Sequence, residues 1–110
     1  SAILIFLIIR PEKLMPAATR IGDADVPHCS DMTRLQGSSN VFVNNIPWSR
    51  QGDVNTGHLV PGSPCPSHQA PIAAGSSTVK VNGKGAGRIG DAISACTSVA
   101  AGSINVFAGG

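Results

Sequence analysis

Short stretches of alternating hydrophobic and polar residues recur along the chain, each bounded by Gly, Ser or Asn. Residues 41–43 and 79–81 follow a Gly-Ser step and have the alternation of a strand with one buried face. Asn44-Asn45 comes directly after the first stretch, and Asn82-Gly83 after the second. Because such pairs are typical of two-residue hairpin turns, residues 47–50 and 85–88 are expected to return as partner strands.

Two phrases recur in alternation. Arg-x-Gly-Asp begins at residues 20, 50 and 88, and a Gly-Ser phrase leading into a strand begins at residues 37, 75 and 102. Units of this size bury their apolar faces against one another and have little stability alone. A catalytic carboxylate is needed in one or two places, whereas this Arg and Asp recur in every unit, so we expect them to cap turns. The sequence predicts an all-β domain of three short-hairpin repeats.

Composition supports this fold class and narrows the function. The length of 110 residues allows one domain, and the 13 Gly and 8 Pro interrupt nearly every stretch that could form a long helix. A hydrophobic fraction of 42% argues against disorder. A net charge of +2 is too weak for a nucleic-acid-binding surface. With only four aromatic residues the core is thin, so a further source of stability is expected.

Residues 1–14 differ in character from the rest of the chain. Their apolar run, residues 3–9, is shorter than the roughly 20 residues that span a bilayer, and it lacks the basic start and cleavage site of a secretory signal. We interpret residues 1–14 as a foreign remnant or an N-terminal extension. Met15 is then the expected native start, and residues 15–110 form the domain.

The loops that precede the Gly-Ser phrases carry possible metal ligands. These loops contain His28, His68 and Cys96, and the longer second loop adds His58. If three repeats pack around a pseudo-threefold axis, these loops converge at one end. Three His and one Cys fill all four positions of a tetrahedral zinc site, which leaves no place for water or substrate. Such a site is structural, and it would stabilise a thin core because metal binding is coupled to folding.

A second ligand set remains open. Cys29, Cys65, His68 and Cys96 are also chemically able to bind zinc, although the repeat register favours His28 and Cys96. If His28 and Cys96 bind the metal as the repeat register favours, Cys65 is a free thiol on a Pro-rich loop. The chain has no nucleophile, phosphate-loop or metalloprotease motif, and few acidic residues remain outside the repeats. We therefore predict that it is not an enzyme.

The segment from Met15 to Asp23, Met-Pro-Ala-Ala-Thr-Arg-Ile-Gly-Asp, resembles the opening of PAAR-repeat proteins, and the later Gly-Ser and Arg-x-Gly-Asp phrases resemble their repeats. The resemblance covers residues 15–110. It departs from the name-giving Pro-Ala-Ala-Arg by the insertion of Thr19. Members of this family are small conical β domains that cap the trimeric β-helical spike of contractile injection machines, either bacterial type VI secretion systems or contractile phage tails.

The resemblance implies a mechanical function and a partner. One structural zinc ion per chain near the vertex agrees with the set His28, His58, His68 and Cys96. One tip per spike trimer would sharpen the spike and help it to penetrate the target cell envelope. The expected location is the tip of a phage tail, or the cytoplasm before type VI secretion, with no signal peptide. The candidate spike-docking residues lie on the predicted strands: Val41, Val43, Val79, Val81 and Val106.

Two other functions remain open at this stage. An adaptor that recruits effector proteins to the spike could use residues 1–14 for attachment. A small zinc hydrolase would need three protein ligands and one open position on the metal.

Overall fold

The computed structural model describes residues 15–28, 30–59 and 67–110. Within these ranges the chain forms short strands, isolated β-bridges and turns, and it contains no helix, as expected for an all-β protein. No described segment is therefore a helix long and apolar enough to cross a membrane. The strands are β1 (Phe42–Val43), β2 (Ile46–Pro47), β3 (His58–Leu59), β4 (Ser67–His68), β5 (Lys80–Val81) and β6 (Lys84–Gly85).

Both predicted hairpins form, but their returning strands are residues 46–47 and 84–85 and not 47–50 and 85–88, because the chain beyond them bridges other segments. β1 pairs with β2 and β5 pairs with β6, both antiparallel. Asn44 and Asn45 have φ angles of 53° and 65°, and Asn82 and Gly83 have φ angles of 55° and 77°. Positive φ at both central residues defines a type I′ turn, whose twist matches that of the flanking strands. Asn and Gly occur here because they tolerate this backbone conformation better than other residues.

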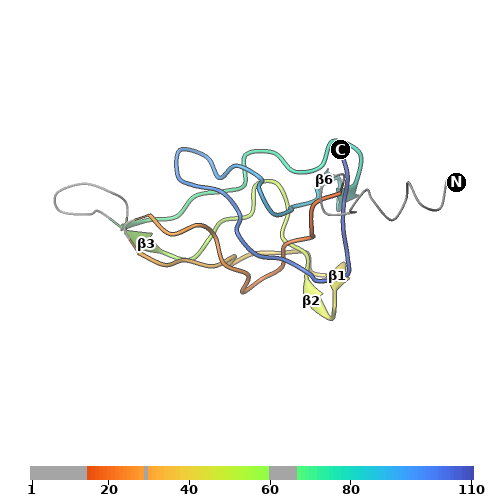
Figure 1. Ribbon diagram of the computed structural model, residues 1–110, viewed down its shortest axis with the longest axis horizontal. Coiled ribbons are helices and arrows are strands. Elements are labelled where there is room, and N and C mark those ends of the chain that lie inside the picture. The colour runs from red at the N-terminus through yellow and green to blue at the C-terminus, as the bar shows by residue number, and fades with distance from the viewer. Residues whose placement is uncertain (1–14, 29, 60–66) are drawn as a thin grey trace, which may run out of the picture.

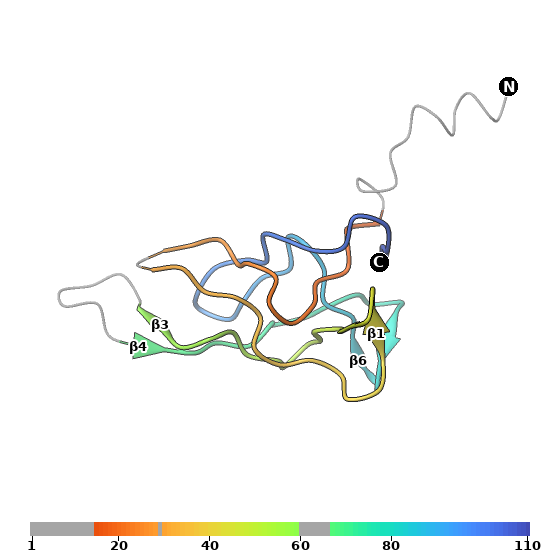
Figure 2. The same ribbon diagram turned by 90° about the horizontal axis from the view of Figure 1, so that it is seen from below.

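The third Gly-Ser phrase pairs differently from the first two. Phe107 forms an antiparallel bridge with Ala17, and the Ala108 N–H donates to the Pro16 carbonyl at 3.0 Å. The Ala18 N–H in turn donates to the Val106 carbonyl at 2.9 Å. The last strand-like segment therefore pairs with the beginning of the described chain, and these two segments lie side by side near the C-terminus (Figure 2).

Each Arg-x-Gly-Asp phrase forms a type II turn. The Asp N–H donates to the Arg carbonyl at 3.0, 2.9 and 3.1 Å, and the intervening Gly has a φ angle of 91°, 88° or 89°. The Asp carboxylate accepts a hydrogen bond from the Arg backbone N–H and forms an ion pair with its guanidinium at 2.8 to 2.9 Å. The predicted turn capping is thus confirmed for Arg20–Asp23, Arg50–Asp53 and Arg88–Asp91.

The three residues that precede these arginines hydrogen-bond to one another in a closed ring. The Thr19 N–H donates to the Gly87 carbonyl at 3.0 Å, the Gly87 N–H to the Ser49 carbonyl at 2.9 Å, and the Ser49 N–H to the Thr19 carbonyl at 3.0 Å. All three residues are buried. A Cβ atom at Gly87 would lie 2.5 Å from the Ser49 carbonyl oxygen, so only glycine fits this member of the ring.

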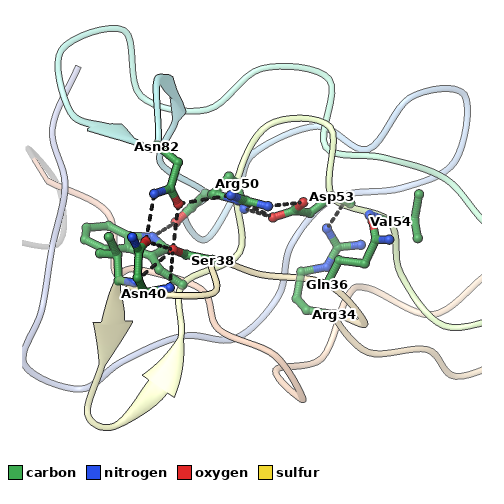
Figure 3. A network of polar contacts seen from close by, with 11 residues as sticks. Arg34, Gln36, Ser38, Asn40, Arg50, Asp53, Val54 and Asn82 are labelled. Carbon is green, nitrogen blue, oxygen red and sulfur yellow. Dashed lines mark hydrogen bonds and ion pairs between the residues drawn. The ribbon is translucent and has the colours of Figure 1, made fainter.

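The hairpin turns are tied to the arginines by a second set of polar contacts. Figure 3 shows Asn82, whose Oδ1 accepts hydrogen bonds from Ser38 Oγ at 2.6 Å and Arg50 Nη1 at 3.0 Å. Asn44 accepts equivalent bonds from Ser103 and Arg20, at 2.6 and 3.0 Å. In a third place the Gly109 carbonyl accepts bonds from the hydroxyl of Ser76 and, at 3.0 Å, from Arg88 Nη1.

The apolar core is divided between the two ends of the molecule. One cluster contains strand residues Val43 and Val81 together with Trp48, whose indole N–H donates to the Gly87 carbonyl at 2.9 Å. A smaller cluster consists of Ala70, Ile72, Ile93 and Val99, and Cys96 packs against it. The described chain narrows from the end with β1, β2 and β6 towards the end with β3 (Figure 1), where β4 also lies (Figure 2). We call these the wide end and the narrow end.

Candidate metal centre

Two of the predicted ligands lie opposite each other on a pair of strands. β3 and β4 are antiparallel, and His58 is the direct partner of His68. Their imidazole centroids are 4.3 Å apart. From the sequence, both residues were expected in one long loop, and their pairing was not predicted. Val54 and Pro71 form an isolated bridge between the same two segments, and no local pattern in the sequence indicates this pairing.

The other two ligands arrive from distant segments. Asp25 forms a bridge with Val99, which places the chain around His28 beside the segment that contains Cys96. Cys96 ends a tight turn in which its N–H donates to the Ile93 carbonyl at 3.0 Å. Three segments that are far apart in the sequence are thus brought together at the narrow end.

The ligand atoms of the four predicted residues converge. The Cys96 sulfur lies 3.1 Å from Nε2 of His28, 3.2 Å from Nε2 of His58 and 3.5 Å from Nε2 of His68. All four ligand atoms are within 4.8 Å of one another. In a tetrahedral zinc site, the bond lengths set the nitrogen-to-sulfur separation at about 3.5 Å. The four residues therefore lie close enough together to hold a metal ion.

The hydrogen-bond chemistry of the cluster also fits a cation. Nδ1 of His58 lies 2.8 Å from the Thr56 carbonyl, so it carries the proton and leaves the Nε2 lone pair directed into the cluster. Nε2 atoms of three imidazoles face the sulfur of Cys96, yet a thiol has only one proton to donate. A central cation would satisfy all four groups at once.

Two pKa values are shifted in this cluster. Desolvation, together with the neighbouring imidazoles of His58 and His28, lowers the pKa of His68 and favours its neutral, metal-binding form. Burial raises the pKa of the Cys96 thiol, and a hydrogen bond from Asn55 opposes that effect. The thiolate form of Cys96 therefore depends on positive charge and hydrogen-bond donors supplied close to the sulfur.

A buried polar cluster lies beside the ligands. Arg34 and Asp25 form an ion pair with a distance of 2.9 Å between Nη2 and Oδ2, and both side chains are completely buried. Arg34 Nη1 also donates to the Asp53 carbonyl at 3.2 Å (Figure 3). Burial raises the pKa of Asp25 and lowers that of Arg34, so the loss of hydration opposes charge on both groups. This pair was not predicted from the sequence, because Asp25 and Arg34 stand outside the repeated phrases.

Other predicted site residues occupy different environments. Cys29 and Cys65 of the alternative ligand set lie outside the described residues, as do residues 1–14. The candidate docking residues lie in or against the apolar cluster of the wide end: Val43 and Val81 are buried, and Val41, Val79 and Val106 pack against them. Their role in partner binding stays a prediction.

The exposed apolar side chains near the docking candidates are Phe42, which is 53% exposed, and Ile104, which is 93% exposed.

Comparisons by sequence found no family model that matches this chain and no similar curated protein.

Proposed function

We propose that this protein is a structural tip of the PAAR-repeat kind, which caps the trimeric β-helical spike of a contractile injection machine. The observation that carries the proposal is the closed ring of backbone hydrogen bonds among Thr19, Ser49 and Gly87. The surrounding contacts of Arg20, Arg50 and Arg88 occur three times in the same order. A single chain with three such repeats around a pseudo-threefold axis can cap a threefold-symmetric partner with one copy per trimer.

The narrow end supplies the second part of the proposal, a conical domain with a metal-bound vertex. His28, His58, His68 and Cys96 would hold one zinc ion, a metal suited to imidazole and thiolate ligands. Four protein ligands leave no open position, so the ion would link separate segments and carry out no catalysis. The positive charge of the ion would stabilise Cys96 as its thiolate.

The wide end would be the face that docks on the spike. Phe42 and Ile104 are exposed apolar side chains on this part of the chain, and they offer surface that a partner could bury. The short strands β1 and β5 present backbone groups near the same end. Under this proposal, the spike pushes on the wide end while the metal-bound narrow end meets the target envelope.

The metal centre is tested by elemental analysis of the purified protein and of single variants. We expect about one zinc ion per chain, and a large loss of zinc in His58→Ala and Cys96→Ala. Lys84→Ala, an exposed substitution in β6 at the wide end, is the control and should keep its zinc. A wild-type protein without zinc would overturn the metal centre. Full zinc retention in His58→Ala would instead favour an open, hydrolase-like site.

Docking is tested with a trimeric β-helical spike protein encoded in the same genome. Native mass spectrometry should detect one copy of this chain on each spike trimer. Phe42→Asp and Ile104→Asp, which place charge on the apolar surface, should weaken that complex. Val26→Asp, the same kind of change at an exposed apolar residue near His28, should not. Absence of binding, or three copies per trimer, would contradict the proposal.

A further inference from the structure

We propose that the glycine pair 109–110 occupies a binding site of its own, which closes the third hairpin of the wide end in place of a covalent turn. The third hairpin is the pairing of residues 16–18 with residues 106–108, which come from opposite ends of the described chain. The site, which we call the glycine socket, consists of Ser76, Ser77, Thr78 and Arg88. The inference depends on neither the metal centre nor the spike.

The third hairpin repeats the pairing of the other two, although no turn joins its strands. In each hairpin one backbone N–H donates to a valine carbonyl: Trp48 to Val41 at 3.0 Å, Ala86 to Val79 at 3.0 Å and Ala18 to Val106 at 2.9 Å. Two turn residues follow the outgoing strand in the first two hairpins, and the same count places Gly109 and Gly110 at the turn of the third. The returning strand would then begin at Pro16, whose carbonyl accepts from the Ala108 N–H, but no peptide bond joins Gly110 to Pro16.

Gly109 makes with its main chain the contacts that asparagine side chains make in the other hairpins. The carboxamide oxygens of Asn44 and Asn82 each accept one bond from a serine hydroxyl and one from an arginine Nη1, as Figure 3 shows for Asn82. Gly109 has no side chain, and its carbonyl oxygen accepts the corresponding bonds from Ser76 Oγ and, at 3.0 Å, from Arg88 Nη1. The third acceptor position is therefore filled by a main-chain carbonyl.

The second residue of the pair must also be glycine. Gly110 has a φ angle of 84°, close to the 65° of Asn45 and the 77° of Gly83 at the second turn position. Its carbonyl accepts a hydrogen bond from Ser77 Oγ at 3.0 Å. A Cβ atom at Gly110 would lie 2.6 Å from Thr78 Oγ1 and 3.0 Å from Ser77 Oγ, whereas a Cβ atom at Gly83 would meet open space. The socket thus excludes a side chain that an ordinary turn would accept.

Two members of the socket are held in position by contacts outside it. Ser76 is buried, and its Oγ accepts hydrogen bonds from the N–H groups of Thr78 and Val79 at 3.1 and 2.8 Å. Its hydroxyl proton is therefore left to donate to the bound carbonyl. The guanidinium of Arg88 forms an ion pair with Asp91 at 2.8 Å, which leaves Nη1 to donate to the same carbonyl. Donors fixed in this way bind an acceptor with little further loss of entropy.

Closure of the third hairpin covers part of the apolar core. Ala18 and Ala108 are buried in the cluster that contains Trp48, and they come from the two strands that no turn joins. A hairpin is marginally stable by itself, and without a turn the approach of its strands costs more chain entropy. The bound glycine pair offsets that cost and keeps the two alanines covered.

Hydrogen exchange in two matched serine variants tests the socket. Ser76→Ala removes a donor to the glycine pair, and Ser38→Ala removes the equivalent donor to Asn82, whose hairpin is joined by a turn. Exchange of the Ala18 amide should speed up about 10-fold in Ser76→Ala, whereas exchange of the Ala86 amide should change less than about 2-fold in Ser38→Ala. Equal changes in the two variants, or an unchanged Ala18 amide, would overturn the proposal.

A measurement on the unaltered protein covers the case in which Ser76→Ala does not fold. Nitrogen-15 relaxation should give the amides of Gly109 and Gly110 order parameters of about 0.85, the value of rigid backbone. Gly83, in a covalently closed turn, is the internal reference. Values below about 0.6 for the glycine pair would show that the socket does not hold it and would overturn the proposal.

Discussion

The two ends of this molecule are held together by different kinds of contact. At the wide end, backbone hydrogen bonds, tight turns and an apolar cluster with Trp48 account for the structure. At the narrow end the apolar cluster is smaller, and a completely buried ion pair lies beside three imidazoles and one thiol. The wide end is thus stabilised mainly by backbone hydrogen bonds, turns and apolar packing, and the buried groups without a hydrogen-bond partner in the backbone ring are the neutral hydroxyls of Thr19 and Ser49. The narrow end instead gathers charged and metal-binding groups that are costly to bury.

The buried charged groups without a full set of partners sharpen this difference. Among the described residues, Oδ1 of Asp25 and Nε of Arg34 are buried with no hydrogen-bond partner, as is Nδ1 of His28. At the wide end the arginines are partly exposed, and each pairs with an aspartate three residues later. The narrow end should therefore be the part whose stability depends on a bound ion.

Removal of the metal is the change with the largest expected effect. Zinc at about 1,000 times its dissociation constant adds about 4 kcal/mol to the free energy of unfolding. A chelator should remove that contribution and lower the melting temperature. Hydrogen exchange should then speed up at the Ile93 and Cys96 amides before it does so at Trp48. Equal loss of protection at both ends would show that the ends do not differ in this way.

Disruption of the buried ion pair should have the next largest effect. Arg34→Met leaves the Asp25 carboxylate buried without its cation, at a cost of about 3–5 kcal/mol in unfolding free energy. The double variant Asp25→Leu/Arg34→Met removes both charges and should recover much of that loss. Urea denaturation followed by Trp48 fluorescence measures each value.

Arg88→Met is the matched control for this pair, since its ion pair with Asp91 is only partly buried. It should cost about 1 kcal/mol. A loss equal to that of Arg34→Met would contradict the claim that burial distinguishes the two ends.

The sequence predicted the wide end better than the narrow end for a physical reason. Its turns depend on short-range chemistry, such as positive φ at Asn82 and Gly83 or the Arg-to-Asp bond within one turn. The closure of Phe107 on Ala17 was not predicted, because it joins segments from opposite ends of the domain. Local patterns contain no information about such a partner.

At the narrow end the four residues of the candidate metal centre were predicted, but the structure around them was not. Alignment of the repeats gave His28 and Cys96 because they occupy matching loops. The β3–β4 pairing and the Asp25–Arg34–Asn55 cluster depend on which distant segments meet, and no phrase in the sequence marks them. The residue type alone shows that a side chain can bind a metal, whereas the residues that contact that side chain depend on the whole fold.

A moderate effect is expected at the glycines of the Arg-x-Gly-Asp turns. Gly52 has a φ angle of 88° with nothing near its missing Cβ atom, so Gly52→Ala introduces backbone strain without a clash. The expected loss is about 1–2 kcal/mol in unfolding free energy. Gly57→Ala is the control, because its Cβ also meets open space while its φ is not positive. It should be neutral or slightly stabilising. Zinc affinity should be unchanged in Gly52→Ala, and a large loss of affinity would mean that the two ends are coupled.

The smallest expected effect is a gain in stability at the narrow end. Ala95, the residue before Cys96, is exposed and has a φ angle of 50°, a left-handed conformation that costs an L-residue about 1–2 kcal/mol. Ala95→Gly relieves that strain, but the more flexible glycine loses more conformational entropy on folding, at a cost of about 0.5–1 kcal/mol. We therefore expect the free energy of unfolding to rise by about 0.5–1 kcal/mol.

Ala92→Gly is the control, and it is expected to lower the stability that Ala95→Gly raises. Ala92 is also exposed and forms a bridge with Ser98, but its φ is not positive, so only the entropic cost of about 0.5–1 kcal/mol applies. If Ala95→Gly were destabilising like Ala92→Gly, backbone strain beside Cys96 would not oppose folding. If it were stabilising but weakened zinc binding, the left-handed turn at Ala95 would be holding the sulfur in place. Strain at that residue would then be part of the metal centre, in contrast to the Gly turns of the wide end.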